Sequence, residues 1–394
     1  MYAFPPVFQC HHWLHSFLQR ELGIDDEAQV AIMEQGVVND MTSSQLALWK
    51  LAQQANSYPE VRQTIENQSP SDLLEVLPNI KGGGEFLQVL QNYLDKYGWR
   101  VEIWFELSTP TWQEDPVPAL RVIQKYLSGE DPDPHLSHAR AARLRRNVIR
   151  RLSARLRNQP EKLSEFKSLL ATARQYLPVR EGRAMWQLIL SGSLRVPCLA
   201  LGEKLSALGI LPGADDIFYF RLEELERVAS GSGNTNWGDV AEERRRERQH
   251  RMSTSPPVFI GRLPESSGDG RTGVSTNGSA KEQVPSEMAV LSGIAASPGV
   301  VQATAQVVLN WEEADKVQPG DILVCRTTSP AWTPLFARLS GVVADGGSVL
   351  SHCANVAREF GIPCVVGVRT GTSQIQDGML IELDGSQGTV QVAG

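Results

Sequence analysis

The chain has 394 residues, of which 41 % are hydrophobic and 21 % are charged, and its net charge is −7. This length accommodates two or three domains, and the composition is that of a globular protein. The acidic balance argues against nonspecific binding to nucleic acid. No apolar run approaches the roughly 20 residues that span a bilayer, and the N-terminus lacks the pattern of a secretion signal. We therefore expect a cytoplasmic protein with no membrane partner.

The cysteines agree with a reducing compartment. There are five of them, an odd number, spread widely along the chain at Cys10, Cys198, Cys325, Cys353 and Cys364. Such spacing does not suggest a framework of disulfides.

Residues 1–260 are predicted to form a mainly α-helical domain. Apolar residues recur every three or four positions in residues 43–55, 83–98 and 115–127, which is typical of helices with one buried face. A further helix over residues 136–157 is rich in arginine and could contact an anionic partner. Because its leucines and valines also form an apolar face, we favour a packed helix whose basic face meets solvent.

One histidine cluster lies near the start of the chain. Cys10, His11, His12 and His15 form the sequence CHHWLH. On a helix, His11 and His15 share one face, a spacing that zinc can use. Because no second group of ligands completes such a site, we predict no metal centre.

A glycine-rich stretch precedes one of the predicted helices. Lys81 is followed by Gly82, Gly83 and Gly84, and glycines before a helix can hold a phosphate. The stretch lacks a following Lys-Ser or Lys-Thr, and no strand precedes it. A loop that starts a helix is the favoured interpretation.

Residues 261–287 are predicted to be a flexible linker. They are rich in Gly, Ser and Thr and contain almost no large apolar side chain. A linker of this length lets a domain move by tens of ångströms, whereas the alternative is an ordered loop of variable sequence.

Residues 288–394 are predicted to form an α/β domain. Short apolar runs bounded by Gly, Pro and Asp occupy residues 320–328, 339–347, 363–368 and 378–385, which is the pattern of buried strands. A helix is expected over residues 332–339. The predicted fold is therefore multidomain, with a helical domain followed by an α/β domain.

His352 is the strongest candidate for a reactive group. It lies in the sequence DGGSVLSHCANVAREFGIP, where residues 353–360 predict a short helix closed by Gly361. A helix N-terminus favours an anion by roughly 0.3 to 1 kcal/mol. A neutral imidazole is a good nucleophile, so this position suits a histidine that becomes phosphorylated. The alternative is a capping or core histidine beside a tight turn.

The segment around His352 resembles the phosphohistidine segment of the swivelling (mobile) domain of phosphoenolpyruvate synthase, pyruvate phosphate dikinase and rifampicin phosphotransferase. A glycine pair, a run of small residues, the histidine, Ala-Arg-Glu and Gly-Ile-Pro follow in the order of that family. The resemblance implies that His352 carries a phosphoryl group. It also implies phosphate contacts by Gly346, Gly347, Ser351 and Arg358. The chain departs from the family pattern at Ser348, Cys353 and Asn355.

The helical part resembles the substrate-binding domain of rifampicin phosphotransferase, on the basis of residues 97–116, 176–186 and 215–228. Five charged residues fall within the first two segments and could contact a polar substrate or form structural ion pairs: Arg100, Glu102, Arg180, Glu181 and Arg183.

These resemblances predict a phosphotransferase component. His352 would carry a phosphoryl group to a small-molecule acceptor. Relatives hold ATP on an ATP-grasp domain that we do not find in this sequence, so we expect ATP and Mg²⁺ on a separate ATP-grasp-type donor and no cofactor on this chain. The alternative is a non-catalytic binding or regulatory protein derived from such an enzyme.

Overall fold

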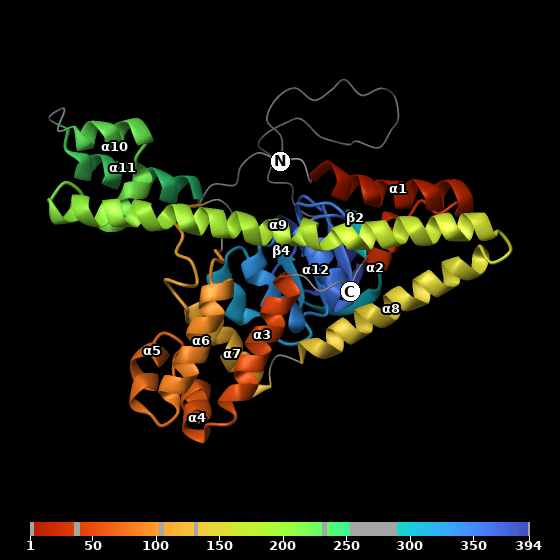
Figure 1. Ribbon diagram of the computed structural model, residues 1–394, viewed down its shortest axis with the longest axis horizontal. Coiled ribbons are helices and arrows are strands. Elements are labelled where there is room, and N and C mark those ends of the chain that lie inside the picture. Colours follow the sequence, from red (N-terminus) through yellow and green to blue (C-terminus); the bar gives the residue numbers. More distant parts are fainter. Residues whose placement is uncertain are drawn as a thin grey trace. The chain divides into compact units, whose positions relative to one another are not determined.

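The computed structural model describes residues 4–34, 40–101, 106–129, 133–230, 235–252 and 290–392 (Figure 1). The chain divides into two compact units. Unit 1 comprises Met1–Cys198 and Val290–Gly394, and unit 2 comprises Leu199–Ala289. The predicted linker, residues 261–287, lies outside the described residues. A mainly helical N-terminal part and a C-terminal α/β part are both present, as the sequence predicts.

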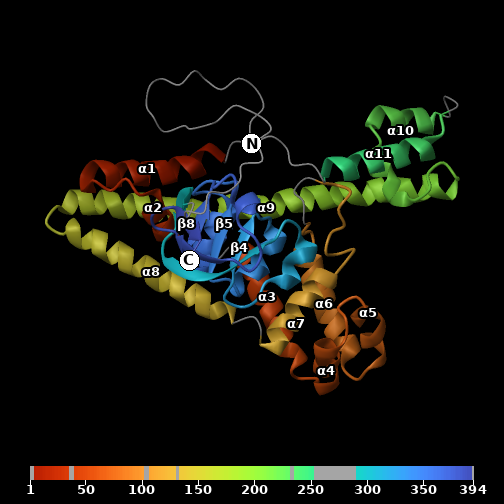
Figure 2. The same ribbon diagram turned by 180° about the vertical axis from the view of Figure 1, so that it is seen from behind.

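The first group of helices in unit 1 packs around its own apolar core. Phe17 and Phe166 stack there with ring centroids 6.1 Å apart, and Leu14 and Leu152 are buried beside them. Figure 2 shows these helices from behind. They are α1 (Phe4–Leu22), α2 (Glu27–Glu34), α8 (Pro134–Arg155) and the first part of α9 (Pro160–Ala207). In the part of the chain that the structure describes, no helix is both long and apolar enough to cross a membrane.

A second group of helices in unit 1 lies against the α/β part and shares a core with it. Leu48, Leu90 and Ile123 are buried in this core, which confirms the apolar faces predicted for residues 43–55, 83–98 and 115–127. The group consists of α3 (Asp40–Ala55), α4 (Pro59–Asn67), α5 (Leu73–Val76), η1 (Leu77–Asn79), α6 (Gly83–Tyr97) and α7 (Val117–Ser128).

The α/β part is built on an eight-stranded sheet with the order β1-β8-β7-β3-β4-β5-β6-β2. Its central strands β3 to β6 are parallel, and the other pairings are antiparallel. The four predicted apolar runs form β4, β5, β6 and β7. The strands are β1 (Val290–Ser292), β2 (Ile294–Ser297), β3 (Val300–Val307), β4 (Ile322–Cys325), β5 (Gly341–Ala344), β6 (Cys364–Val366), β7 (Leu380–Asp384) and β8 (Thr389–Val392).

Side chains alternate between the two faces of this sheet. In β4, Ile322 and Val324 belong to a core with β7, whereas Leu323 and Cys325 face the core shared with the helices. The second face is covered by α12 (His352–Phe360) and by the 3₁₀ helix η4 (Pro330–Ala337), which occupies most of the predicted helix 332–339. The remaining elements are η3 (Trp311–Lys316) and α13 (Gly371–Gln374).

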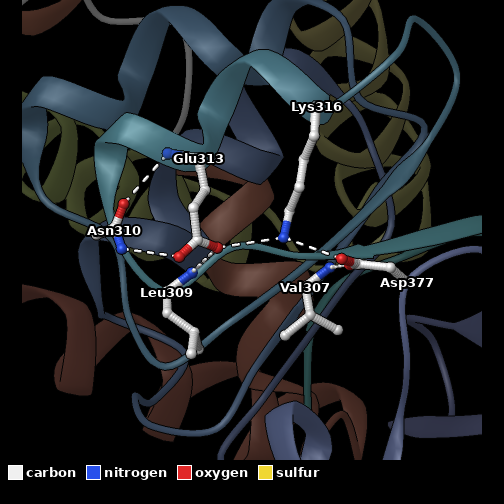
Figure 3. Close-up of polar contacts among 6 residues, drawn as sticks. All are labelled: Val307, Leu309, Asn310, Glu313, Lys316 and Asp377. Carbon is white, nitrogen blue, oxygen red and sulfur yellow. Dashed lines mark hydrogen bonds and ion pairs between the residues drawn. The ribbon is translucent and has the colours of Figure 1, made fainter. Parts of the chain in front are cut away.

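A polar network fixes the connection between β3 and η3 (Figure 3). The backbone N–H of Val307 donates to Asp377 Oδ1 over 2.6 Å. Lys316 Nζ lies 3.0 Å from Asp377 Oδ2 and 3.2 Å from Glu313 Oε2. Asn310 caps η3 by accepting a hydrogen bond from the N–H of Glu313 over 3.2 Å. This network holds η3 in place on the sheet.

Polar contacts join the helical part to the α/β part within unit 1. Asp315 of η3 lies 2.9 Å from Lys125 Nζ and 3.5 Å from Arg121 Nη1, both on α7. Arg100 Nη1 donates to the carbonyl oxygen of Pro330 over 3.0 Å. These contacts bring Arg100 to the segment that covers the sheet beside α12.

Unit 2 contains the end of α9 and three further elements, η2 (Ala214–Tyr219), α10 (Leu222–Ala229) and α11 (Trp237–Met252). Glu224 accepts hydrogen bonds from Arg244 Nη1 at 2.6 Å and from Nη2 at 2.7 Å. Arg245 pairs with the buried carboxylate of Asp216. Arg244 and Arg245 therefore hold α11 to the elements before it.

Candidate active site

His352 is the first residue of α12, at the end of the loop that follows β5. Ser351 is the N-cap with extended backbone, and the helix ends at Gly361, whose φ of 67° is left-handed. The predicted helix and its glycine terminator are confirmed. His352 therefore lies where free backbone N–H groups and the helix dipole favour negative charge.

The loop before His352 is held by backbone hydrogen bonds to the loop after β4. The N–H of Asp345 donates to Cys325 O and that of Gly346 to Arg326 O, each over 2.9 Å. Gly347 has a φ of 117°, and a Cβ at this position would lie 2.9 Å from Ser351 Oγ. Only glycine meets both requirements without strain, so the predicted glycine pair shapes the approach to the histidine.

The imidazole of His352 contacts the loop and helix on the other side of the site. Its Nε2 lies 3.4 Å from Thr333 Oγ1, and its ring is hydrogen-bonded to the backbone of Ser329. The side chain is half-buried. Burial and, to a smaller extent, the positive charge of Arg100 lower the pKa of His352 to about 4, against the opposing effect of the hydrogen bond to Ser329. The imidazole is therefore neutral at pH 7 and retains the lone pair that a nucleophile needs.

Arg358 was predicted to contact phosphate, and its observed contacts are with protein oxygens. Its side chain is 2 % exposed. Nη1 donates to the carbonyl oxygen of Ala296 over 2.6 Å, and Nη2 donates to Asn355 Oδ1. In this structure Arg358 ties α12 to β2, and its role as a phosphate ligand stays a prediction.

Two departures from the family pattern lie on the inner face of α12. Cys353 is buried with its Sγ 3.9 Å from that of Cys364 on β6, and Asn355 contacts Arg358 as described. Both side chains point away from solvent into the packing between α12 and the sheet. These residues therefore change the support beneath the histidine while leaving its exposed edge unaltered.

The five charged candidates of the helical part differ in where the structure places them. Arg100 is buried, lies over the ring of Trp112 and reaches the loop beside His352. Arg183 is half-buried on α9. Arg180 and Glu181 also lie on α9, but their side chains, like all of Glu102, fall outside the described residues. Arg100 is thus the candidate that the described structure brings to the histidine.

The family resemblance places the start of the predicted helix 332–339 near the histidine, although Thr333 and Ser329 are not among the predicted site residues. Thr333 and the backbone of Ser329 contact the imidazole directly, and both belong to the run TTSPAWTP that follows a buried strand. Hydroxyl residues at the carboxyl end of a central parallel strand were the available signal, since ligands bind at that edge of α/β sheets.

The two other motifs of the helical part have structural explanations. His11 Nδ1 lies 3.0 Å from Glu34 Oε2, and His15 Nε2 lies 3.3 Å from Asp25 Oδ1. Among the described residues, no group of three or more potential ligands could hold a metal ion. A Cβ at Gly83 would lie 1.8 Å from Leu77 O, so this glycine serves the packing of a helix start.

Residues 317–388 match the family described as the mobile domain of PEP-utilising enzymes. This match places the α/β part, with His352 at the start of α12, in a class of domain found in phosphoryl-transferring enzymes. Residues 1–181 match the family described as the fourth domain of rifampicin phosphotransferase. The chain therefore matches one family over its helical part and the other over its α/β part.

Several curated proteins are similar to this chain. The chain is 34 % identical over 384 residues to chondramide synthase of Chondromyces crocatus, which covers 93 % of this chain and 10 % of that protein. It is 30 % identical over 390 residues to rifampicin phosphotransferase of Streptomyces sviceus, covering 96 % of this chain and 43 % of that enzyme. Phosphoenolpyruvate synthase of Aeropyrum pernix is 44 % identical over 111 residues, which cover 28 % of this chain and 14 % of that enzyme. The chain thus spans less than half the length of each of these relatives.

Proposed function

We propose that this chain is a phosphotransferase component in which His352 carries a phosphoryl group to a small-molecule acceptor. The observation that carries the proposal is a neutral imidazole at the N-terminus of α12, within a match to the mobile domain of PEP-utilising enzymes. The match of residues 1–181 to a rifampicin phosphotransferase domain supports an acceptor site in the helical part.

The reaction has two halves. In the first, an imidazole nitrogen attacks the terminal phosphorus of a donor, a P–N bond forms, and the bond between phosphorus and the donor oxygen breaks. In the second, a nucleophile of the acceptor attacks the same phosphorus, and the P–N bond breaks to return a neutral imidazole. A histidine that is neutral at pH 7 supplies the lone pair for the first half, and its departing nitrogen takes up the proton that the acceptor's nucleophile loses in the second.

The proposed donor is ATP with Mg²⁺, bound by a separate ATP-grasp-type protein in the cytoplasm. We propose that residues 288–394 form the carrier domain, that residues 1–260 hold the acceptor, and that the linker 261–287 lets the carrier move between donor and acceptor. Holding both reactants on one chain makes delivery effectively intramolecular, which can raise its rate by several orders of magnitude.

The test is intact-mass analysis of the purified chain under three conditions. ATP and Mg²⁺ alone should add no mass. Addition of lysate from the source organism, which supplies the donor, should add an acid-labile phosphate to the wild-type chain and none to His352→Ala. The variant should remain folded, because replacing a partly exposed residue at a helix start rarely costs more than about 1 kcal/mol. Equal labelling of the two proteins would overturn the proposal.

A further inference from the structure

Three buried hydroxyl groups lie close to His352 without a hydrogen-bond partner among the described residues. They are Thr328 Oγ1, Ser329 Oγ and Ser351 Oγ. Thr328 and Ser329 are each 5 % exposed. A buried hydroxyl that makes no hydrogen bond is unfavourable, and natural structures contain few of them. Three such groups in one place form a polar lining suited to a ligand rich in oxygen atoms.

The hydroxyls converge because two loops are joined at this edge of the sheet. Thr328 and Ser329 follow β4, and Ser351 precedes His352 in the loop after β5. The hydrogen bond from Gly346 to Arg326 O, 2.9 Å long, holds the two loops side by side. The backbone of Ser329 is also hydrogen-bonded to the imidazole itself. Ser351 directly precedes His352, and Thr328 and Ser329 lie on the segment whose backbone contacts the imidazole.

A cation from the helical part completes the surroundings. Arg100 is 1 % exposed, and its Nη1 donates to Pro330 O, one residue beyond Ser329, over 3.0 Å. Its guanidinium is close enough to His352 to disfavour a second positive charge on the imidazole. The same charge becomes favourable when the imidazole bears a phosphoryl group, which is a dianion.

We propose that the hydroxyls of Thr328 and Ser329, together with Arg100, bind the oxygens of the phosphoryl group carried by the histidine. The inference rests on the proposed function and adds a specific binding site to it. Because Arg100 belongs to the helical part, the site is complete only while the helical and α/β parts are in contact. The arrangement in this structure is therefore the one that accommodates the phosphohistidine.

The experiment uses phosphoramidate, a small phosphoryl donor that needs no partner protein. An imidazole nitrogen attacks phosphorus, the P–N bond to the amino group breaks, and ammonia leaves with the proton. Intact mass gives the rate of labelling, and thermal unfolding gives the stability. The double variant Thr328→Val with Ser329→Ala should be labelled about tenfold more slowly. Its melting temperature should be unchanged or higher, because the removed hydroxyls lack partners among the described residues.

Two matched controls lie at the opposite ends of the same strands. Ser340 Oγ donates to Asp321 O over 3.2 Å, so Ser340→Ala should lose stability and keep the wild-type labelling rate. Arg338 is also a buried arginine, and its Nη1 donates to Val317 O over 2.9 Å. Arg100→Gln and Arg338→Gln should both lower the melting temperature, but only Arg100→Gln should slow labelling.

The outcomes separate the inference from the proposed function. If His352→Ala is labelled like the wild type, the proposed function fails and the inference fails with it; if phosphoramidate does not label the wild type at all, the inferred binding site is refuted, and the labelling with lysate decides the proposed function. If labelling depends on His352 but the double variant and Arg100→Gln react at the wild-type rate, the phosphohistidine stands and the binding site is refuted. Slow labelling of these variants, with the controls at the wild-type rate, establishes the site.

Discussion

In unit 2, charged side chains hold α10 and α11 together, and their carboxylates are paired: Glu224 binds Arg244 through two hydrogen bonds, and Asp216 binds Arg245. In the α/β part of unit 1, both faces of the sheet are apolar, and buried hydroxyls without partners among the described residues gather at His352. Paired polar groups stabilise a fold, whereas unpaired ones cost stability and are kept where they serve binding or catalysis. The paired charges of unit 2 are thus explained by the stability of the fold, whereas the unpaired hydroxyls at His352 are explained by binding or catalysis.

We expect acid to lower the free energy of unfolding in two pH ranges, one set by His352 and the other by Glu224. The pKa of His352 is lowered to about 4 by burial and by Arg100. The contribution of the neutral imidazole to the free energy of unfolding is therefore full above about pH 6.5 and is lost as the pH falls to 4. The hydrogen bonds from Arg244 lower the pKa of Glu224 from 4.5 to about 2, so its effect is full above 4.5 and is lost as pH falls to 2. Because lowering a pKa by one corresponds to about 1.4 kcal/mol, each loss is at most about 3 kcal/mol, and solvent screening reduces it.

Urea unfolding between pH 2 and pH 8 measures both windows. His352→Gln should reduce the pH dependence of stability between pH 4 and 6.5, and Glu224→Gln should reduce the dependence below pH 4.5. A wild-type stability that stays constant between pH 4 and pH 6.5 would show that the imidazole is not held in its neutral form.

At neutral pH, Glu224→Gln should destabilise unit 2 by about 1 to 3 kcal/mol, because Arg244 then keeps its charge without its carboxylate. Hydrogen exchange of residues 214–252 should rise, while phosphorylation of His352 should not change. Glu223 is exposed on the same helix and provides the control, since Glu223→Gln should leave exchange unaltered. Equal exchange in the two variants would mean that the ion pair is not what holds α11.

The smallest effect is expected at the network of Figure 3. The side chain of Lys316 is 32 % exposed, and both of its carboxylate partners are more exposed still. Lys316→Ala should cost about 0.5 kcal/mol or less, because exposed ion pairs contribute little. A loss above about 2 kcal/mol in the free energy of unfolding, measured with urea, would instead mean that this surface ion pair contributes as much as the ion pairs of unit 2.

Local sequence determined much of this protein. The apolar runs of residues 320–328, 339–347 and 363–368 predict β4 to β6, because buried parallel strands need continuous apolar residues bounded by turns, and the run of residues 378–385 predicts the antiparallel strand β7. Gly347 and Gly361 have positive φ values that only glycine adopts readily. The local sequence therefore also determines the loop before His352 and the end of the helix that follows it.

Only the tertiary structure decided what surrounds the histidine. Arg100 meets Pro330 across 230 residues of sequence, and no local pattern reports a contact at that separation. α9 runs through Pro178 and Pro197, where propensity alone predicts a break. Whether a hydroxyl is paired depends on every chain segment that folds around it. The local sequence motif therefore suggested a reactive histidine, and only the tertiary structure showed which groups lie around it.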